Sequence, residues 1–214
     1  MLEIDNFTLT VAGQRLLRID RLQVAAGQLV TLLGPSGTGK SSFLKAIAGV
    51  SDPEACVVGC LRLQGRDLTA LPAHRRRIGY VEQRPALFPH LNVQQNLAFG
   101  QRQRDQAALD KALAVAELSD LAQADVATLS GGQAARVALM RTLLAAPRAL
   151  LLDEPFAALD PALRASLRSF VFAQARAAGL PTVLVTHDRA DAAAAGGPLY
   201  SLTRQSLKLH DAAD

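Results

Sequence analysis

Long apolar runs are absent from this 214-residue chain, and so is the pattern of a secretory leader. No apolar segment reaches the roughly 18 residues that a membrane-spanning helix needs. Residues 1–5 show no basic region followed by an apolar one. These two absences predict a cytoplasmic protein. The 27 residues after His187 are too few for a second domain, so none is expected at the C-terminus.

Cysteine and net charge are also scarce. Cys56 and Cys60 are the two cysteines, with neither a second pair nor nearby histidines to complete a zinc site. Reduced cytosolic thiols are the favoured interpretation, and a zinc site is the alternative. The net charge of +4 suits phosphate ligands or an anionic membrane surface, and equally a protein that is simply soluble.

The chain does contain a glycine-rich segment with the pattern Gly, four residues, Gly-Lys-Ser. It lies between an apolar run at residues 29–33 and a helical pattern at residues 41–48, and this strand–turn–helix context predicts a phosphate-binding loop. Backbone N–H groups and the helix N-terminus would surround the phosphates. Lys40 would reach the β- and γ-phosphates, and the Ser41 hydroxyl would ligate Mg²⁺. The predicted ATP-binding residues are Gly34, Pro35, Ser36, Gly37, Thr38, Gly39, Lys40, Ser41 and Ser42.

The periodicity of the remaining segments predicts an α/β fold. Alternating residues over 2–24 and 56–68 predict an N-terminal antiparallel β subdomain with a turn near Ala12-Gly13. Wholly apolar runs over 29–33, 149–152 and 181–186 predict strands of a parallel sheet covered on both faces, and residues 78–81 predict a further strand. Helices are expected over 134–146 and 161–178. Residues 1–214 are therefore predicted to form one domain, with a helical insert over about 85–146.

Two acidic residues, Asp153 and Glu154, end the apolar run at 149–152. In an open parallel sheet the ligand lies beyond the carboxyl ends of the strands, so both carboxylates should face the phosphate site. Asp153 is placed to hold Mg²⁺ through water, and Glu154 to accept a proton from the attacking water.

A second glycine-rich helix start, Ser130-Gly131-Gly132-Gln133, precedes the helix expected near Ala134. Its outward N–H groups and hydroxyl would suit an anion; alone, it would be read as an N-capped helix. The phosphates of one bound nucleotide need only one such helix start. If the second serves the γ-phosphate of a partner's nucleotide, two chains must pack head to tail.

Taken together, these motifs resemble those of the ATP-binding cassette (ABC) ATPases, the P-loop NTPase subunits of ABC transporters, over essentially the whole chain. Six motifs occur in the family's order: the Walker A loop at 34–42, the Q-loop at Gln83, the signature at 129–133, the Walker B strand at 150–155, the D-loop at 158–160 and the switch His187.

The resemblance implies an ATPase with ATP and Mg²⁺ as ligands. Gln83 would sense Mg²⁺ and the water, and His187 would contact the γ-phosphate and orient Glu154. The expected catalytic residues are Glu154, His187 and Gln83, and the expected Mg²⁺ site is Ser41, Gln83 and Asp153. Residues expected to act across a dimer are Ser130, Gly131, Gly132, Gln133 and Asp160. A second copy or a homologous ATPase would complete that dimer.

The segment from Pro85 to Leu97 resembles bacterial importer ATPases in particular. The resemblance implies that Phe88, Pro89 and Leu91 contact a transmembrane permease; core packing within the insert is the alternative. The protein would then lie peripherally on the inner face of the membrane and drive import, with a substrate-binding protein as a further candidate partner. A small exporter ATPase is an alternative reading.

Two other classes fit the sequence less well. A DNA-maintenance ATPase of the same superfamily would carry a long coiled coil between Lys40 and Ser130, but these residues are 90 positions apart without heptads. No nucleic-acid partner is therefore expected. A small-molecule kinase would need an acceptor lid and would not need the signature.

One departure from the family concerns adenine: Val11 stands where many relatives have an aromatic residue, so weaker contact with the base is expected.

Overall fold

The computed structural model describes residues 1–35, 37–101, 103–203 and 207–209. The chain divides into two compact units. The first comprises Met1–Tyr80, Arg148–Asp153 and Phe172–Asp214, and the second comprises Val81–Pro147 and Glu154–Val171. The predicted domain limits, residues 1–214 with an insert over about 85–146, stay a prediction.

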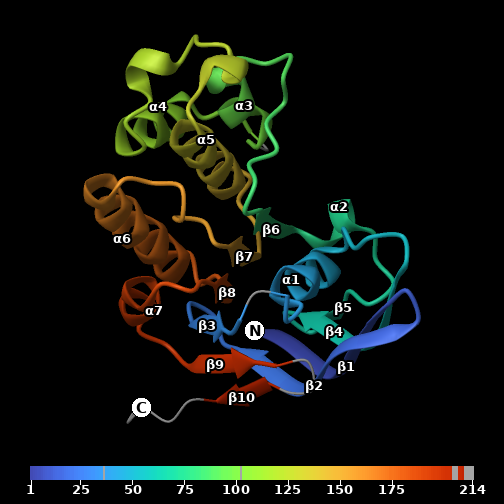
Figure 1. Cartoon of the computed structure of the whole chain (residues 1–214). Coiled ribbons are helices and arrows are strands. Elements are labelled where there is room, and N and C mark those ends of the chain that lie inside the picture. The colour runs from blue at the N-terminus through green and yellow to red at the C-terminus, as the bar shows by residue number, and fades with distance from the viewer. Residues whose placement is uncertain (36, 102, 204–206, 210–214) are drawn as a thin grey trace. The chain divides into compact units, whose positions relative to one another are not determined.

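The first unit contains an antiparallel sheet, as predicted. It consists of β1 (Leu2–Val11), β2 (Gln14–Val24), β4 (Ala55–Leu63) and β5 (Arg66–Asp67), in the order β2-β1-β4-β5 (Figure 1). Alternate residues of β1 are buried because one face of the sheet packs on the core. The predicted turn at Ala12-Gly13 is confirmed, since both residues have positive φ and the flanking Val11 pairs with Gln14.

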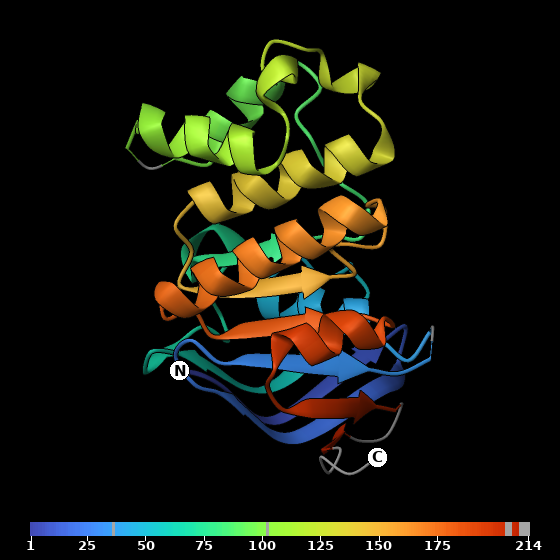
Figure 2. The same cartoon turned by 90° about the vertical axis from the view of Figure 1, so that its left-hand side faces the viewer.

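A second sheet has the order β10-β9-β3-β8-β7-β6. Its strands are β3 (Leu29–Leu33), β6 (Ile78–Val81), β7 (Ala149–Asp153), β8 (Thr182–Val185), β9 (Leu199–Leu202) and β10 (Leu207–Leu209). β7, β8, β3 and β9 run parallel, and Figure 2 shows their arrows pointing the same way. Every residue of β7 and β8 is buried, which confirms the prediction of strands covered on both faces. Strands β9 and β10 were not predicted.

The helices of the first unit include α1 (Lys40–Ala48), α2 (Ala73–Arg76) and α7 (Arg189–Ala195). Helix α1 packs into the core that the two sheets share, where the Phe43 ring meets the Phe7 ring edge-on with centroids 5.3 Å apart. This packing places the first residue of α1 directly after the loop that leaves β3.

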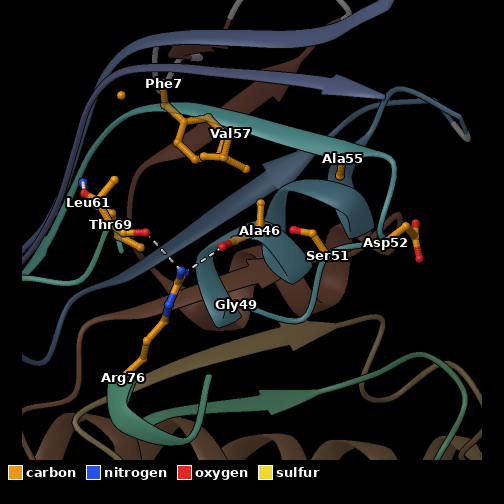
Figure 3. A pocket seen from close by; sticks show the side chains of 11 residues that line it. Phe7, Ala46, Gly49, Ser51, Asp52, Ala55, Val57, Leu61, Thr69 and Arg76 are labelled. Carbon is orange, nitrogen blue, oxygen red and sulfur yellow. Dashed lines mark hydrogen bonds between the residues drawn. The ribbon is translucent and has the colours of Figure 1, made fainter. Parts of the chain in front are cut away.

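Arg76 fixes the opposite end of α1. Its guanidinium donates hydrogen bonds to the carbonyl oxygens of Ala46 and Ile47, each at 2.8 Å, and to that of Leu71 at 2.7 Å. Burial lowers the pKa of Arg76. Figure 3 shows the guanidinium between Thr69 and Ala46. Arg76 is one of the residues that line a pocket of about 240 Å³. A cation at the C-terminal carbonyls of a helix offsets the negative end of its dipole.

The second unit is helical apart from its connecting segments. It contains α3 (Val93–Phe99), α4 (Gln106–Val115) and α5 (Gly131–Leu144), and each of these helices contacts the other two. Two short 3₁₀ turns, Ser119–Leu121 and Val126–Thr128, lie between α4 and α5. Helix α6 (Pro161–Ala177) begins in this unit and ends in the first.

The predicted start of the helix near Ala134 was wrong, because α5 begins at Gly131. The reason is a reciprocal cap: the Gln133 N–H donates to the Ser130 hydroxyl, and the Ser130 N–H donates to the Gln133 side chain. Such a capping box satisfies two N–H groups at the helix start.

Within the described part of the chain, no helix combines the length and apolar character needed to cross a bilayer.

Candidate functional site

The phosphate loop joins β3 to α1, the arrangement that its sequence pattern predicts. Gly39 is the N-cap residue of α1 and has φ +92°, a conformation that residues with a Cβ rarely adopt. A Cβ on Gly39 would also come within 2.9 Å of the Leu16 side chain. Among the described residues, no side chain caps this helix N-terminus, which leaves its first N–H groups suited to an anion. Ser36 lies outside the described residues.

Lys40 points back into the loop. Its Nζ atom donates hydrogen bonds to the carbonyl oxygens of Gly34 at 2.7 Å and Pro35 at 2.8 Å. The Thr38 hydroxyl also donates to the Pro35 oxygen, at 2.9 Å. These contacts hold an ammonium group beside the helix N-terminus, so two sources of positive potential meet at one place.

Asp153 is the last residue of β7 and is 2% exposed. The Tyr80 hydroxyl donates to its Oδ2 atom at 3.4 Å. Helix α1, which carries Ser41 in its first turn, contacts β7. A hydroxyl and a carboxylate oxygen are the hard ligands that Mg²⁺ prefers. Ser41 and Asp153 of the first unit are thus of the ligand type that Mg²⁺ needs, and their role as its ligands stays a prediction. Elsewhere, Cys56 and Cys60 are both free.

Glu154 directly follows Asp153 and belongs to the second unit. Its φ of +49° is in the left-handed region, which is costly for a residue with a side chain. Such strain is concentrated at functional sites. The Glu154 carbonyl accepts a hydrogen bond from the Ala157 N–H, so the chain turns sharply after β7. Gln83, the other candidate in this unit, is exposed shortly after β6.

His187 lies in the first unit, in the short connection from β8 to α7, and its side chain is exposed. Its neighbour Thr186 is fully buried, and so is Asp191 in α7. The sequence indicated the histidine but not these two polar neighbours. Buried polar groups normally have hydrogen-bond partners. The hydrogen bonds of Thr186 and Asp191 therefore help to determine the backbone conformation at His187.

The signature residues lie at the start of α5 in the second unit. Ser130 and Gly131 are exposed. Gly132 is enclosed: a Cβ at this position would come within 3.0 Å of the Ala158 carbonyl oxygen. Asp160 is exposed, and its side chain accepts a hydrogen bond from the Leu163 N–H at the start of α6. Both Ser130 and Asp160 thus have local roles as helix caps in the single chain.

The predicted permease-contact residues differ in exposure. Pro89 is exposed, while Phe88 and Leu91 are half-buried. The Phe88 ring packs on the Phe99 ring with centroids 4.4 Å apart, and the Arg141 guanidinium lies 4.8 Å from its centroid. Phe99, which the sequence did not single out, is 64% exposed. Phe88 and Phe99 thus form a small aromatic cluster with one exposed member, and the permease contact stays a prediction.

Asn96 and Arg141 hold this segment in place. Asn96 is fully buried, accepts the Phe88 N–H, and donates to the carbonyl oxygens of Phe88 and Leu91. Arg141 of α5 donates to the Ala86 carbonyl and to the Asn96 side chain. Burial lowers the pKa of Arg141. These contacts connect the Phe88 segment to the helix that begins at the signature.

Comparison with known proteins identifies the family and the fold of the chain. The profile of the family described as "ABC transporter" matches residues 17–157, more than half of the chain. The chain belongs to the ABC transporter family. Its fold is that of an ABC ATPase: a solved structure of the dimeric ATP-binding cassette MJ0796, in a post-hydrolysis state with ADP and Pi, superposes with a TM-score of 0.85. That alignment has 27% identity and covers 99% of this chain and 98% of the other.

Two curated relatives of this ABC cassette differ in length. This chain is 48% identical to the Fe(3+) ions import ATP-binding protein FbpC of Pseudomonas fluorescens over 179 residues. The aligned region covers 80% of this chain and 50% of the relative. The chain is 42% identical to the uncharacterized ABC transporter ATP-binding protein YnjD of Escherichia coli, covering 89% of this chain and 90% of that one. The chain thus spans about half the length of several curated relatives that it matches.

Proposed function

We propose that this chain is the ATP-hydrolysing subunit of an ABC transporter, and that it drives the movement of a substrate through a separate membrane permease. The observation that carries the proposal is the cradle between β3 and α1. There Lys40 Nζ is held 2.7 Å and 2.8 Å from two loop carbonyls, next to a helix start whose N-cap residue, Gly39, has no side chain. Such a site is suited to the phosphates of a nucleotide.

ATP would bind with its phosphates along residues 34–42, where backbone N–H groups and Lys40 supply the positive potential. Ser41 and Asp153, together with Gln83, would hold Mg²⁺. The ion supplies positive charge that neutralises the β- and γ-phosphate oxygens. Val11, which is half-buried against the core, offers adenine an aliphatic contact rather than a stacking one.

Hydrolysis requires a water to be aligned with the γ-phosphate and relieved of a proton. Glu154 would accept that proton, and His187 would contact the γ-phosphate and orient Glu154 and the water. The left-handed φ of Glu154 supports this assignment, because the surrounding chain holds the residue in an unfavourable conformation.

Two copies, or this chain and a homologous ATPase, would pack head to tail. Ser130, Gly131, Gly132 and Gln133 of one subunit would then bind the γ-phosphate held by the other, and Asp160 would contact the opposite subunit. The exposed start of α5 supports this role, as does the dimeric state of the structural relative. ATP binding would close the dimer and hydrolysis would release it.

Import is the proposed direction, because the relatives include proteins named as import ATP-binding proteins. Phe88, Pro89 and Leu91 would contact the permease, and Phe99 extends the same aromatic cluster. The subunit would then lie on the cytoplasmic face of the membrane, and a substrate-binding protein would deliver the cargo.

Replacement of Glu154 by Gln tests the proposal. The amide cannot accept the proton from water, so hydrolysis should fall by a factor of about 10² or more. Nucleotide binding should persist, since the phosphate cradle is unchanged. With Mg²⁺ and ATP, light scattering should therefore report a stable dimer of E154Q, whereas the wild type returns to monomers as ATP is consumed.

The matched control is Lys40→Ala, which should lose both nucleotide binding and the ATP-dependent dimer. Hydrolysis by E154Q at the wild-type rate would show that another group is the base. Failure of the wild-type chain to bind ATP at all would contradict the proposed function itself.

A further inference from the structure

The connection from β8 to α7 is short and holds an exposed histidine between buried polar residues. β8 ends at Val185 and α7 begins at Arg189, which leaves three residues between them. Thr186 is 0% exposed and Asp191 is 1% exposed. The exposed His187 therefore projects from a backbone whose two sides are anchored in the interior.

The Thr186 hydroxyl makes two hydrogen bonds that bracket His187. It donates to Asp191 Oδ2 at 3.2 Å, and it accepts the Asp188 N–H at 3.1 Å. One hydroxyl thus connects the residue before the histidine to the residue after it, and both to the first turn of α7. The turn leaves the His187 backbone little freedom to rotate, because any rotation would stretch one of these two bonds.

Helix α7 reinforces the same turn. Its N-cap residue, Asp188, accepts the Ala190 N–H at 2.6 Å. Asp191 is the third residue of the helix, where the dipole favours a negative charge. A buried carboxylate is costly unless it is hydrogen-bonded, and the Thr186 hydroxyl is one of the donors that stabilise Asp191.

We infer that Thr186 and Asp191 are positioning residues for His187: the buried hydroxyl–carboxylate pair fixes the backbone from which the histidine reaches the γ-phosphate. The inference rests on the proposed ATPase function. Neither residue touches ATP in this arrangement; both act through His187. Loss of the hydroxyl would let the imidazole sample other directions, so hydrolysis would slow while nucleotide binding stayed nearly the same.

Thr186→Val and Thr186→Ser form the central pair of variants. Valine has nearly the shape of threonine but no hydroxyl, whereas serine keeps the hydroxyl. We expect T186V to lower kcat by about 10-fold or more, because small misplacements of a catalytic group cost that much. The KM for ATP should stay within about twofold of the wild-type value, because the variant leaves the contacts that bind ATP in the ground state unchanged. T186S should keep most of the wild-type rate.

Thr182→Val controls for the loss of a buried hydroxyl as such. Thr182 is also 0% exposed and lies in the same strand, but its hydroxyl donates to the Leu180 carbonyl at the opposite end of β8. Thermal unfolding of T182V and T186V should shift similarly, while T182V keeps its kcat. All rates are measured on the full chain with Mg²⁺ and ATP, at a temperature where circular dichroism shows each variant folded.

A double-mutant cycle with His187→Ala decides whether the pair acts through the histidine. Single-turnover hydrolysis of labelled ATP, with the protein in excess, measures the slow variants. If T186V slows the wild type but adds little in the H187A background, the coupling supports the inference. If T186V slows both by the same factor, or if T182V slows hydrolysis as much, the role is only structural and the inference is wrong.

The same data separate this inference from the proposed function. A wild-type rate for H187A would contradict the role proposed for the histidine, and the inference with it. A large loss in H187A together with an unchanged T186V would leave the proposed function intact and overturn only the positioning role. Asp191→Asn, which keeps an oxygen acceptor, and Asp191→Ala should reproduce the contrast seen between T186S and T186V.

Discussion

At the residue scale, the two signature glycines differ in what surrounds them. A Cβ on Gly131 would meet no atom within 4 Å, whereas one on Gly132 would come within 3.0 Å of the Ala158 carbonyl oxygen. Both residues lie in the first turn of α5. The sequence does not distinguish the two glycines. In the structure of the single chain, a side chain would be crowded at Gly132 but not at Gly131.

Gly131→Ala and Gly132→Ala should therefore have opposite effects on stability. Alanine favours a helix over glycine, so G131A should raise the free energy of unfolding slightly, by about half a kcal/mol. G132A should lower it by about 1 kcal/mol, because the Ala158 backbone must move to admit the methyl group. Urea unfolding of the nucleotide-free chain measures both. Equal effects of the two variants would show that the Ala158 contact is unimportant.

Residues whose roles follow from local sequence context were identifiable before the structure. Lys40 follows from the spacing of the glycine-rich loop, and Asp153 from the end of a buried strand. Tyr80, Thr186 and Asp191 could not be found in this way, because their partners are side chains or backbone groups brought together by folding. A polar residue in an apolar run signals a buried hydrogen bond without identifying the partner.

At the element scale, prediction succeeded where burial determines composition. β3, β7 and β8 are apolar at nearly every position because both of their faces are buried in a parallel sheet. β9 and β10 have only four and three residues, so their strand character depends on pairing. Helix α7 contains a run of alanines without amphipathic contrast. Its caps, Asp188 and Gly196, were the local signals that could have indicated it.

The Phe88 segment leads to a prediction for coupling to the permease. Phe88→Ala would remove the ring that contacts both Phe99 and the Arg141 guanidinium. If this segment is the permease contact, F88A should lose most transport and permease-stimulated hydrolysis. Hydrolysis by the isolated chain should persist, because the phosphate cradle belongs to the other unit.

Urea unfolding of isolated F88A distinguishes docking from core packing. Truncation of a half-buried aromatic ring should cost about 1–3 kcal/mol, which a stable fold tolerates. A chain that no longer folds would show that Phe88 is chiefly a core residue of the second unit. Full transport by a folded F88A would contradict the proposed contact.

At the scale of the whole molecule, the proposed head-to-tail dimer has a consequence for mixtures. Lys40→Ala would disable the proposed phosphate cradle of a chain, and Gly131→Arg would obstruct its signature. Gly131 is exposed and a Cβ there meets no described atom within 4 Å, so the arginine can extend into solvent. Each variant alone should be inactive. A dimer of one copy of each would combine the intact cradle of one chain with the intact signature of the other.

Mixing the two variants in equal amounts should therefore restore hydrolysis to at most about half of the wild-type rate, because only mixed dimers can close on ATP and each has one intact site where the wild type has two. The measurement is steady-state ATPase activity at a protein concentration that supports the ATP-bound dimer. A mixture no faster than its separate components would argue against sites shared between two chains.

The contact between Arg76 and the last carbonyls of α1 has a consequence for the opposite end of that helix. The guanidinium offsets the negative pole, whereas Gly39 at the positive pole has no side chain that could cap the helix. The electrostatic asymmetry is built in when the chain folds, and Lys40 increases it. A phosphate bound there as proposed would meet a field that is already oriented, and little of the binding free energy would be lost to rearranging the protein.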